Sequence, residues 1–443
     1  MKSSRGTDLL RKTALLFVLI VSLAGLCGCG VSDMIDEANE GNAPGNNAIK
    51  VIDANGDEIE TSVSVIDESE AEDNESAPLP ASNLALAAQN FTFSENENFA
   101  YNQLSESGKT CYREIYAIIS DMLEGVELSS RDTDEVDLAF RAVMLDHPEI
   151  FYVKGYSIKK YMNGNDLKKI VFSGTYTMSK GAADSARERV EAYVDDFISR
   201  APEDGDDYDK IKYVYDRLIR TNEYVPDSEN NQNILSVVDN GRTVCQGYTK
   251  AMQLILNRMG IFCTLVNGTA CGQNGVPDAN DLKNAANAEW GGHVWNIIKC
   301  NGMYYNCDVT WGDAVITLMS DDGSLSRDID INYEFFLVDD AALMDSHKPE
   351  PVVTMPRCNS MEDSFYRHEG LYFTDIDSDQ FYRAFENAYA NGETYLYLKA
   401  SDSYVFDKIK SHLFDDQNIF KYMGRTNVKY VDFSDRNLIM ISL

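Results

Sequence analysis

The sequence GRTVCQGYTKAM, residues 241–252, decides the fold class of this chain. Thr243 and Gln246 have the spacing of a capping box, which predicts a helix that begins at Val244. Cys245 would then lie in the first turn, where unpaired backbone N–H groups and the helix dipole favour an anion. These conditions favour the thiolate, which is the nucleophilic form of cysteine. The stretch therefore predicts a reactive cysteine at a helix N-terminus.

The predicted helix continues as far as Gly260, a residue type that commonly follows a helix C-terminus. Its apolar positions form one stripe at helical spacing: Cys245, Tyr248, Met252, Ile255 and Met259. The thiol should therefore face a packed sheet instead of bulk water. The alternative interpretation is that Cys245 is a small core residue, since free cysteines are often buried.

A second stretch, GHVWNIIKCNGMYYNCDVTWGD at residues 292–313, predicts a β-hairpin. Asn301-Gly302 between two apolar runs is a strong signal for a two-residue turn. Such a turn places Cys300 opposite Met303 and continues the pairing so that opposite residue numbers sum to 603. The expected pairs further along are His293 with Thr310 and Trp295 with Asp308.

In this register His293 and Asp308 share one face of the hairpin as diagonal neighbours. A carboxylate at that distance can hold one imidazole nitrogen as a donor and leave the other facing the thiol. The sequence thus predicts a catalytic triad of Cys245, His293 and Asp308. The alternatives are an ordinary strand histidine and a solvated carboxylate.

Three motifs resemble those of the bacterial transglutaminase-like superfamily: Val244–Tyr248 (VCQGY), His293–Asn296 (HVWN) and Asp308–Trp311 (DVTW). The resemblance covers about residues 205–345. It implies an α+β, papain-like core, with the cysteine helix packed on an antiparallel sheet, and thiol acyl chemistry. Members of this superfamily include cross-linking transferases, peptidases and many proteins of unknown activity.

Gln246, Trp295 and Trp311 are predicted to be substrate-adjacent, although core packing explains the two tryptophans equally well. Gln246 is also a tentative second donor to the oxyanion, beside the Cys245 backbone N–H. We expect no metal and no cofactor. Cys300 and Cys307 would lie on the opposite face of the hairpin from His293 and Asp308, so we interpret them as structural. His147 and His347 could be rival bases, but no fixed register places a carboxylate beside either of them.

The rest of the folded chain predicts smaller α+β units on both sides of the core. Expected helices are 109–124, 133–146, 181–199, 207–222 and 378–391, and expected strands are 156–162, 168–177, 371–374 and 394–399. Pro349 and Pro351 indicate a boundary. We therefore divide the folded chain into residues 93–202, a catalytic core at 203–350 and a C-terminal region at 351–443. The polar loop at 271–292 is either a substrate-selecting rim or an inert surface loop.

The N-terminus is typical of a bacterial lipoprotein. A basic segment precedes an apolar run that is too short to span a bilayer comfortably, so residues 1–28 are expected to be a signal peptide. Leu26-Cys27-Gly28-Cys29 resembles a lipobox, with Cys29 as the lipidated residue; a plain secretory signal or a retained anchor helix is the alternative. Residues 30–90 contain 14 acidic residues, one lysine and no aromatic residue. Residues 29–92 are therefore predicted to be a disordered tether.

The formal net charge of −33 argues against nucleic acid as a partner. The expected protein is extracytoplasmic and anchored by lipid to the bacterial cell membrane. Its expected function is that of a cysteine peptidase or amidase acting on protein or cell-wall peptides. A cross-linking transglutaminase and a catalytically silent binding or scaffold lipoprotein are the alternatives.

Overall fold

A computed structural model describes residues 47–52, 58–67, 79–80, 98–272, 275, 287–313 and 331–443 of the 443-residue chain. The expected signal peptide, Cys29 and most of the loop at 271–292 lie outside the described residues. Among the residues that are described, no helix is both long enough and apolar enough to cross a membrane.

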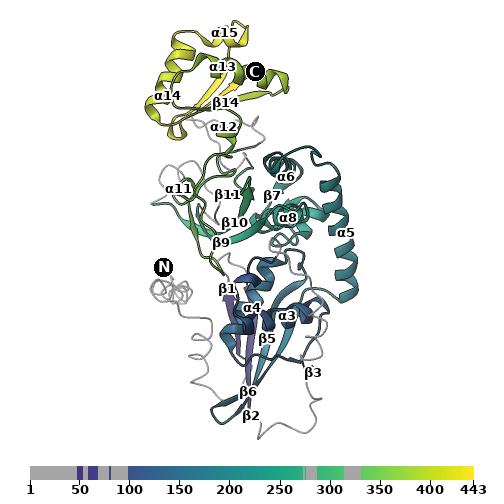
Figure 1. The fold of residues 1–443 in the computed structure, drawn as a ribbon. Coiled ribbons are helices and arrows are strands. Elements are labelled where there is room, and N and C mark those ends of the chain that lie inside the picture. Colours follow the sequence, from purple (N-terminus) through teal and green to yellow (C-terminus); the bar gives the residue numbers. More distant parts are fainter. Residues whose placement is uncertain are drawn as a thin grey trace, which may run out of the picture. The chain divides into compact units, whose positions relative to one another are not determined.

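The N-terminal region contains a six-stranded sheet in the order β1-β2-β5-β6-β4-β3 (Figure 1). Its strands are β1 (Asn47–Ile52), β2 (Glu58–Asp67), β3 (Leu79–Pro80), β4 (Val126–Glu127), β5 (Val153–Asn163) and β6 (Asp166–Tyr176). The accompanying helices are η1 (Tyr101–Gln103), α3 (Glu106–Ser120) and α4 (Thr133–Asp146). The two-residue turn Gly164-Asn165 joins β5 to β6, at the predicted place.

The tether predicted over residues 29–92 is wrong where β1 and β2 form. β2 pairs in parallel with β5, from Glu60 opposite Gly155 to Asp67 opposite Met162. Thr61 and Val63 on β2 are buried. The acidic composition suggested disorder, but alternate apolar positions let a polar segment add to an existing sheet edge, which supplies its backbone partners.

The central region places helices against a second sheet, in the order β11-β10-β9-β12. Its strands are β9 (Cys263–Cys271), β10 (Trp290–Cys300), β11 (Met303–Cys307) and β12 (His347–Pro349), and every pairing is antiparallel. The other elements are α5 (Lys180–Ser199), α6 (Asp207–Thr221), β7 (Glu223–Tyr224), α7 (Leu235–Asp239), β8 (Arg242–Thr243), α8 (Cys245–Arg258) and α11 (Asp340–Leu343). Helix α8 contacts β9 and β10. The predicted fold class, a cysteine helix packed on an antiparallel sheet in an α+β chain, is confirmed.

The C-terminal region has its own four-stranded sheet, in the order β13-β14-β16-β15. Its strands are β13 (Tyr372–Phe373), β14 (Tyr395–Ala400), β15 (Tyr430–Phe433) and β16 (Leu438–Ser442). The helices are α12 (Phe365–His368), α13 (Ser378–Ala390), α14 (Ser403–Lys410), η2 (Ser411–Asp415), α15 (Ile419–Met423) and η3 (Ser434–Arg436). The predicted strand–helix–strand order at its start is observed.

Helix α8 begins one residue later than predicted, and it has no capping box. Val244 is the N-cap residue, and no side chain caps the helix there. The Thr243 hydroxyl instead forms a hydrogen bond with Ser236 at 2.6 Å. The Thr243 hydroxyl, which the capping prediction required, therefore binds another side chain. Cys245 is the first helical residue.

The hairpin has the predicted register but is shorter than predicted. Cys300 lies opposite Met303, and the pairing continues to Asn296 opposite Cys307. β11 then ends, so the predicted ladder pair of Trp295 with Asp308 does not form, and neither does that of His293 with Thr310. The chain leaves the sheet at Asp308, whose carboxylate accepts from the next backbone amides in a local turn.

Candidate active site

Cys245 is the first residue of α8 and is almost buried, with 7% of its surface exposed. The helix is attached to β10 one turn later, where the Thr249 hydroxyl donates to the Val294 carbonyl at 3.3 Å. The Asn296 side chain returns a bond of 3.2 Å to the Thr249 carbonyl. These bonds hold the start of α8 beside the strand that carries His293.

Asp308 and His293 form a short hydrogen bond inside the protein. Nε2 of His293 lies 2.7 Å from Oδ2 of Asp308, and both residues are fully buried. The other carboxylate oxygen, Oδ1, accepts from the backbone amides of Thr310 and Trp311 at 2.9 and 3.0 Å. The carboxylate is therefore held at both oxygens, although Asp308 lies beyond the end of β11.

The second nitrogen of His293, Nδ1, is directed to the cysteine side of the site. Burial by itself opposes protonation of His293, but the charge and hydrogen bond of Asp308, and then the nearby Cys245 sulfur, raise its pKa well above the usual range. Nδ1 has no partner at full hydrogen-bond geometry among the described residues. The thiol is thus a close neighbour of the imidazole, and their hydrogen bond is not tightly formed in this state, as is common in unliganded active sites.

Burial alone would raise the pKa of Asp308. The charge and hydrogen bond of His293, together with those of His347, outweigh burial and hold that pKa well below its ordinary value. Asp308 is therefore ionised at neutral pH and can only accept hydrogen bonds.

His347 is a second histidine at the same carboxylate, which sequence reasoning missed. Its Nε2 lies 3.1 Å from Oδ2 of Asp308, and the residue is fully buried. β12 pairs with β9 so that His347 is opposite Ala270, while β10 places His293 opposite Gly268. Positions two apart on β9 share a face, so both histidines reach one side of the sheet. No local spacing signals this pairing, because β12 follows β9 by more than 70 residues.

Trp295 and Trp311 surround the two imidazoles and are fully buried. The Trp311 ring lies 5.7 Å from the His293 ring and 4.3 Å from the His347 ring. The indole N–H of Trp311 donates to the Gly275 carbonyl at 3.0 Å, and that of Trp295 donates to Asn306 at 3.2 Å. Both tryptophans are core residues around the site, and their predicted contact with substrate stays a prediction.

Gln246 follows Cys245 in the first turn and is also buried. Its side-chain oxygen has no hydrogen-bond partner among the described residues. This oxygen can only accept a hydrogen bond, whereas an oxyanion needs the side-chain N–H, so the predicted function as oxyanion donor stays a prediction.

The chain has six other described cysteines, and burial affects most of their thiols. All of them are buried and none forms a disulfide in the structure. Burial is the largest cause that raises the thiol pKa at five of them: Cys111, Cys263, Cys300, Cys307 and Cys358. A raised pKa disfavours the thiolate, which is the reactive form of cysteine.

His293, Asp308 and His347 could together ligate a metal ion, since each offers one ligand atom within 4.8 Å of the others. The same atoms already form hydrogen bonds with one another. The group is therefore satisfied as a hydrogen-bonded cluster of one carboxylate and two imidazoles.

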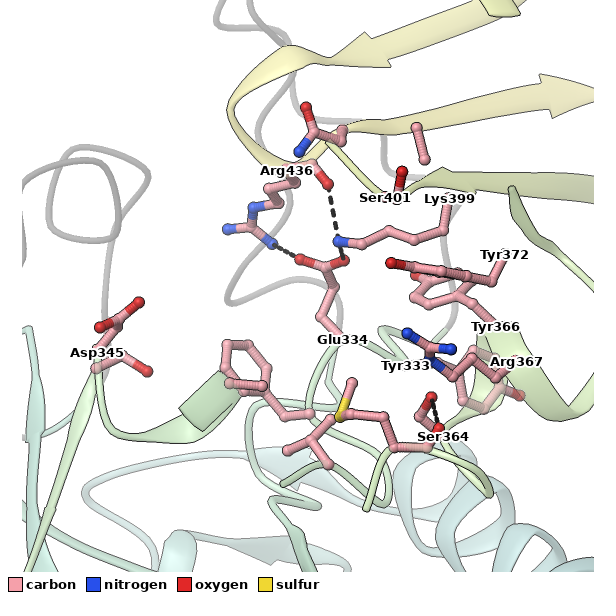
Figure 2. A pocket seen from close by; sticks show the side chains of 17 residues that line it. Tyr333, Glu334, Asp345, Ser364, Tyr366, Arg367, Tyr372, Lys399, Ser401 and Arg436 are labelled. Atoms are coloured by element: carbon pink, nitrogen blue, oxygen red, sulfur yellow. Dashed lines mark hydrogen bonds and ion pairs between the residues drawn. The ribbon is translucent and has the colours of Figure 1, made fainter. Parts of the chain in front are cut away.

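A cavity of about 520 Å³ is lined by residues between Tyr333 and Asn437 (Figure 2). Phe335 and Ser346 line it. Ser346 forms a hydrogen bond with Nδ1 of His347 at 2.9 Å, and Phe335 packs edge-on against Trp311. Figure 2 shows Lys399 and Arg436 directed at Glu334, which forms ion pairs with both. Two of the three cations that line the cavity are thus paired with Glu334, and the third, Arg367, lies over the Tyr372 ring at 4.1 Å.

The sequence of residues 192–309 matches the model of the Transglutaminase-like superfamily. This part of the chain is therefore a transglutaminase-like domain, and it contains Cys245, His293 and Asp308. No curated protein matches the chain.

Solved structures with similar folds have low sequence identity to this chain. A structure of a TGase is 12% identical, with a TM-score of 0.23, and the match covers 36% of this chain and 44% of that one. The periplasmic domain of TgpA from Pseudomonas aeruginosa, bound to ethylmercury, is 18% identical, with a TM-score of 0.20, over 32% of this chain and 55% of that one. The chain thus spans about half of these proteins, and the likeness is too low to carry an argument about activity.

Proposed function

We propose that the transglutaminase-like domain is a thiol acyl-transfer enzyme, and specifically a cysteine peptidase or amidase that acts on protein or cell-wall peptides. The observation that supports it best is the buried pair of Asp308 and His293 next to a cysteine at a helix start. A buried carboxylate that orients an imidazole beside a nucleophile is the arrangement that acyl transfer requires.

In the proposed reaction Cys245 is the nucleophile and His293 is the acid and base. The Cys245 sulfur attacks the carbonyl carbon of an amide, and Nδ1 of His293 gives its proton to the leaving amine as the C–N bond breaks. Water then attacks the thioester carbonyl and gives a proton to His293, and the C–S bond breaks to release the carboxylic acid and the Cys245 thiolate. Asp308 holds Nε2 throughout, so the ring keeps Nδ1 toward the sulfur.

The oxyanion of the tetrahedral intermediate needs donors near Cys245. The backbone N–H of Cys245, at the start of α8, is the first candidate. The Gln246 side chain is the second candidate in this proposal.

A cross-linking transferase would use the same thioester and pass the acyl group to an amine. The acidic net charge of −33 could attract lysine-bearing acceptors, which favours this alternative. Transfer nevertheless requires a bound amine that outcompetes water by proximity. Hydrolysis has no such requirement, and for this reason we prefer it.

The first test is selective alkylation. Limiting iodoacetamide, followed by peptide mass spectrometry, is expected to label Cys245 ahead of the five thiols whose pKa burial raises. Cys300→Ser serves as the matched control and should leave the labelling of Cys245 unchanged. An inert Cys245 with preferential labelling elsewhere would favour the catalytically silent binding lipoprotein.

The second test separates hydrolysis from transfer. A glutamine-containing peptide is supplied with and without a labelled primary amine. We expect acid or cleavage product to exceed amine incorporation, and the reverse ratio would make the protein a transferase.

We also propose that the protein is extracytoplasmic and held at the bacterial cell membrane by lipid on Cys29. The lipobox sequence at residues 26–29 supports this proposal. Cys29→Ser should release the protein from the membrane fraction or leave its signal uncleaved. Unchanged fractionation and mass would refute the anchor.

A further inference from the structure

One carboxylate oxygen of Asp308 serves two histidines. Oδ2 lies 2.7 Å from Nε2 of His293 and 3.1 Å from Nε2 of His347, while Oδ1 is occupied by two backbone amides. A fully buried carboxylate must satisfy its lone pairs inside the protein. Asp308 therefore has four donors, two at each oxygen, and His347 is one of the two that are side chains.

The protonation of His347 follows from its partners. Because Asp308 is an acceptor only, Nε2 of His347 must carry a proton. Burial lowers the pKa of His347 despite the opposing hydrogen bond and charge of Asp308, which favours the neutral form of the ring. The Ser346 hydroxyl lies 2.9 Å from Nδ1 of His347 and also donates to the Leu343 carbonyl at 3.2 Å. Ser346 therefore contacts the ring on the side away from Asp308.

A neutral donor suits this position for an electrostatic reason. A second imidazolium beside Asp308 would compete with His293 for the negative charge, and the two cations would repel each other. A neutral ring instead holds the carboxylate in place without cancelling its charge.

We propose that His347 is a positioning residue of this site: it holds Oδ2 of Asp308 in the orientation that His293 requires. The inference rests on the proposed function of Cys245, His293 and Asp308. Without the donor from β12, the carboxylate would keep its two amide bonds at Oδ1 but could turn Oδ2 away from His293.

The test compares two substitutions in the full chain. His347→Leu removes the donor, and His347→Gln keeps a side-chain N–H that can reach Asp308. We expect alkylation of Cys245 by iodoacetamide to slow by about tenfold in His347→Leu, a typical loss for an outer-shell partner. His347→Gln should recover most of that loss. His147→Gln is the matched control, since His147 is a partly buried histidine whose carboxylate partner, Glu149, lies 2.8 Å away.

The pH dependence separates positioning from a general loss of packing. If Oδ2 turns away, His293 loses its carboxylate partner and the pKa of His293 falls. The alkaline limb of the plot of alkylation rate against pH should then move to lower pH in His347→Leu and return to its wild-type position in His347→Gln. An unchanged limb, a limb at higher pH, or equal behaviour of the two variants overturns the proposal.

Two further measurements keep this test decisive. Ser346→Ala is a milder change, and it should move the limb in the same direction if His347→Leu fails to fold. If wild-type Cys245 is not alkylated at all, the proposed function fails, and NMR titration of the His293 ring tests the positioning proposal separately. A lower His293 pKa in His347→Leu supports the positioning proposal, and an unchanged His293 pKa refutes it.

Discussion

Strands β10 and β12 flank β9 on its two sides, and each brings one histidine to Asp308. β10 is an 11-residue strand of a hairpin, and its His293 is 15 positions from Asp308 in the chain. β12 has three residues, and its His347 is 39 positions from Asp308 on the other side. Histidines can therefore reach one carboxylate both through the register of a local hairpin and through the pairing of distant strands. Only the hairpin register can be predicted from the sequence.

The two rings also differ in charge. Asp308 raises the pKa of His293 despite burial, whereas burial lowers the pKa of His347. The shorter bond, 2.7 Å against 3.1 Å, belongs to the ring that gains the charge. This agrees with the greater strength of charge-assisted hydrogen bonds. The charge and hydrogen bond of the shared acceptor thus favour the charged form of His293, while burial favours the neutral form of His347.

The largest expected effect is at the ring on β10. His293→Gln removes the proton carrier, and turnover of any substrate found for the enzyme should fall by about 1,000-fold, within the range for acid–base groups. Steady-state assays of this variant beside His347→Gln sharpen the comparison, since the latter should keep most activity. Equal losses in both would mean that the two rings share one function.

Asp308→Asn removes the acceptor of both histidines and should lower turnover by about 100-fold, at the low end of the range for acid–base groups. The reason is that the carboxamide no longer selects the imidazole tautomer. His293 should lose its proton at lower pH, so the alkaline limb of the rate profile moves down. Because Asp308 raises the pKa of His293, the pair stabilises the fold fully below the ordinary histidine pKa and progressively less as pH rises through the folded value. Denaturant titrations of both proteins across that alkaline range check the sign. Wild-type turnover in a folded Asp308→Asn protein would remove Asp308 from the site.

Gly268→Ala should separate the two strands physically. Gly268 on β9 lies opposite His293 on one side and Pro349 on the other. A Cβ atom there would lie 2.2 Å from the Lys348 carbonyl oxygen and 2.9 Å from the Trp295 ring. We expect a loss of about 1–3 kcal/mol in the free energy of unfolding, as for other overpacked sites, with displacement of β12.

The control for this change is Gly181→Ala on α5, where an added Cβ has nothing within 4 Å. Thermal or urea unfolding of the two variants gives the comparison. A Gly268→Ala protein as stable as the control would show that β12 moves without cost.

The smallest expected effect is at Ser346. Ser346→Ala leaves Nδ1 of His347 without its hydroxyl partner but keeps the strand pairing of β12. The alkylation rate of Cys245 should fall only about twofold to threefold, close to the value of one neutral hydrogen bond. A loss as large as that of His347→Leu would mean that the Ser346 hydroxyl matters as much to the site as the His347 ring.

Other differences between expectation and structure have the same origin as the missed histidine. The composition of residues 58–67 indicated disorder, yet β2 forms because β5 offers an edge to pair with. Thr243 had capping-box spacing, yet Ser236 binds its hydroxyl. In both cases a partner from a distant part of the chain overrode a local signal.

What the sequence by itself determined is the local frame: a helix that starts at Cys245 within one residue, a hairpin turn at Asn301-Gly302, and a register that brings His293 near Asp308. Side-chain period and turn geometry specify these over a few residues. Only the tertiary structure decided where β11 ends, how β12 pairs with β9, and that His347 shares Asp308. Those contacts join segments separated by long loops, and the free energy that selects them comes from burial and hydrogen bonding in the assembled core, which no local spacing encodes.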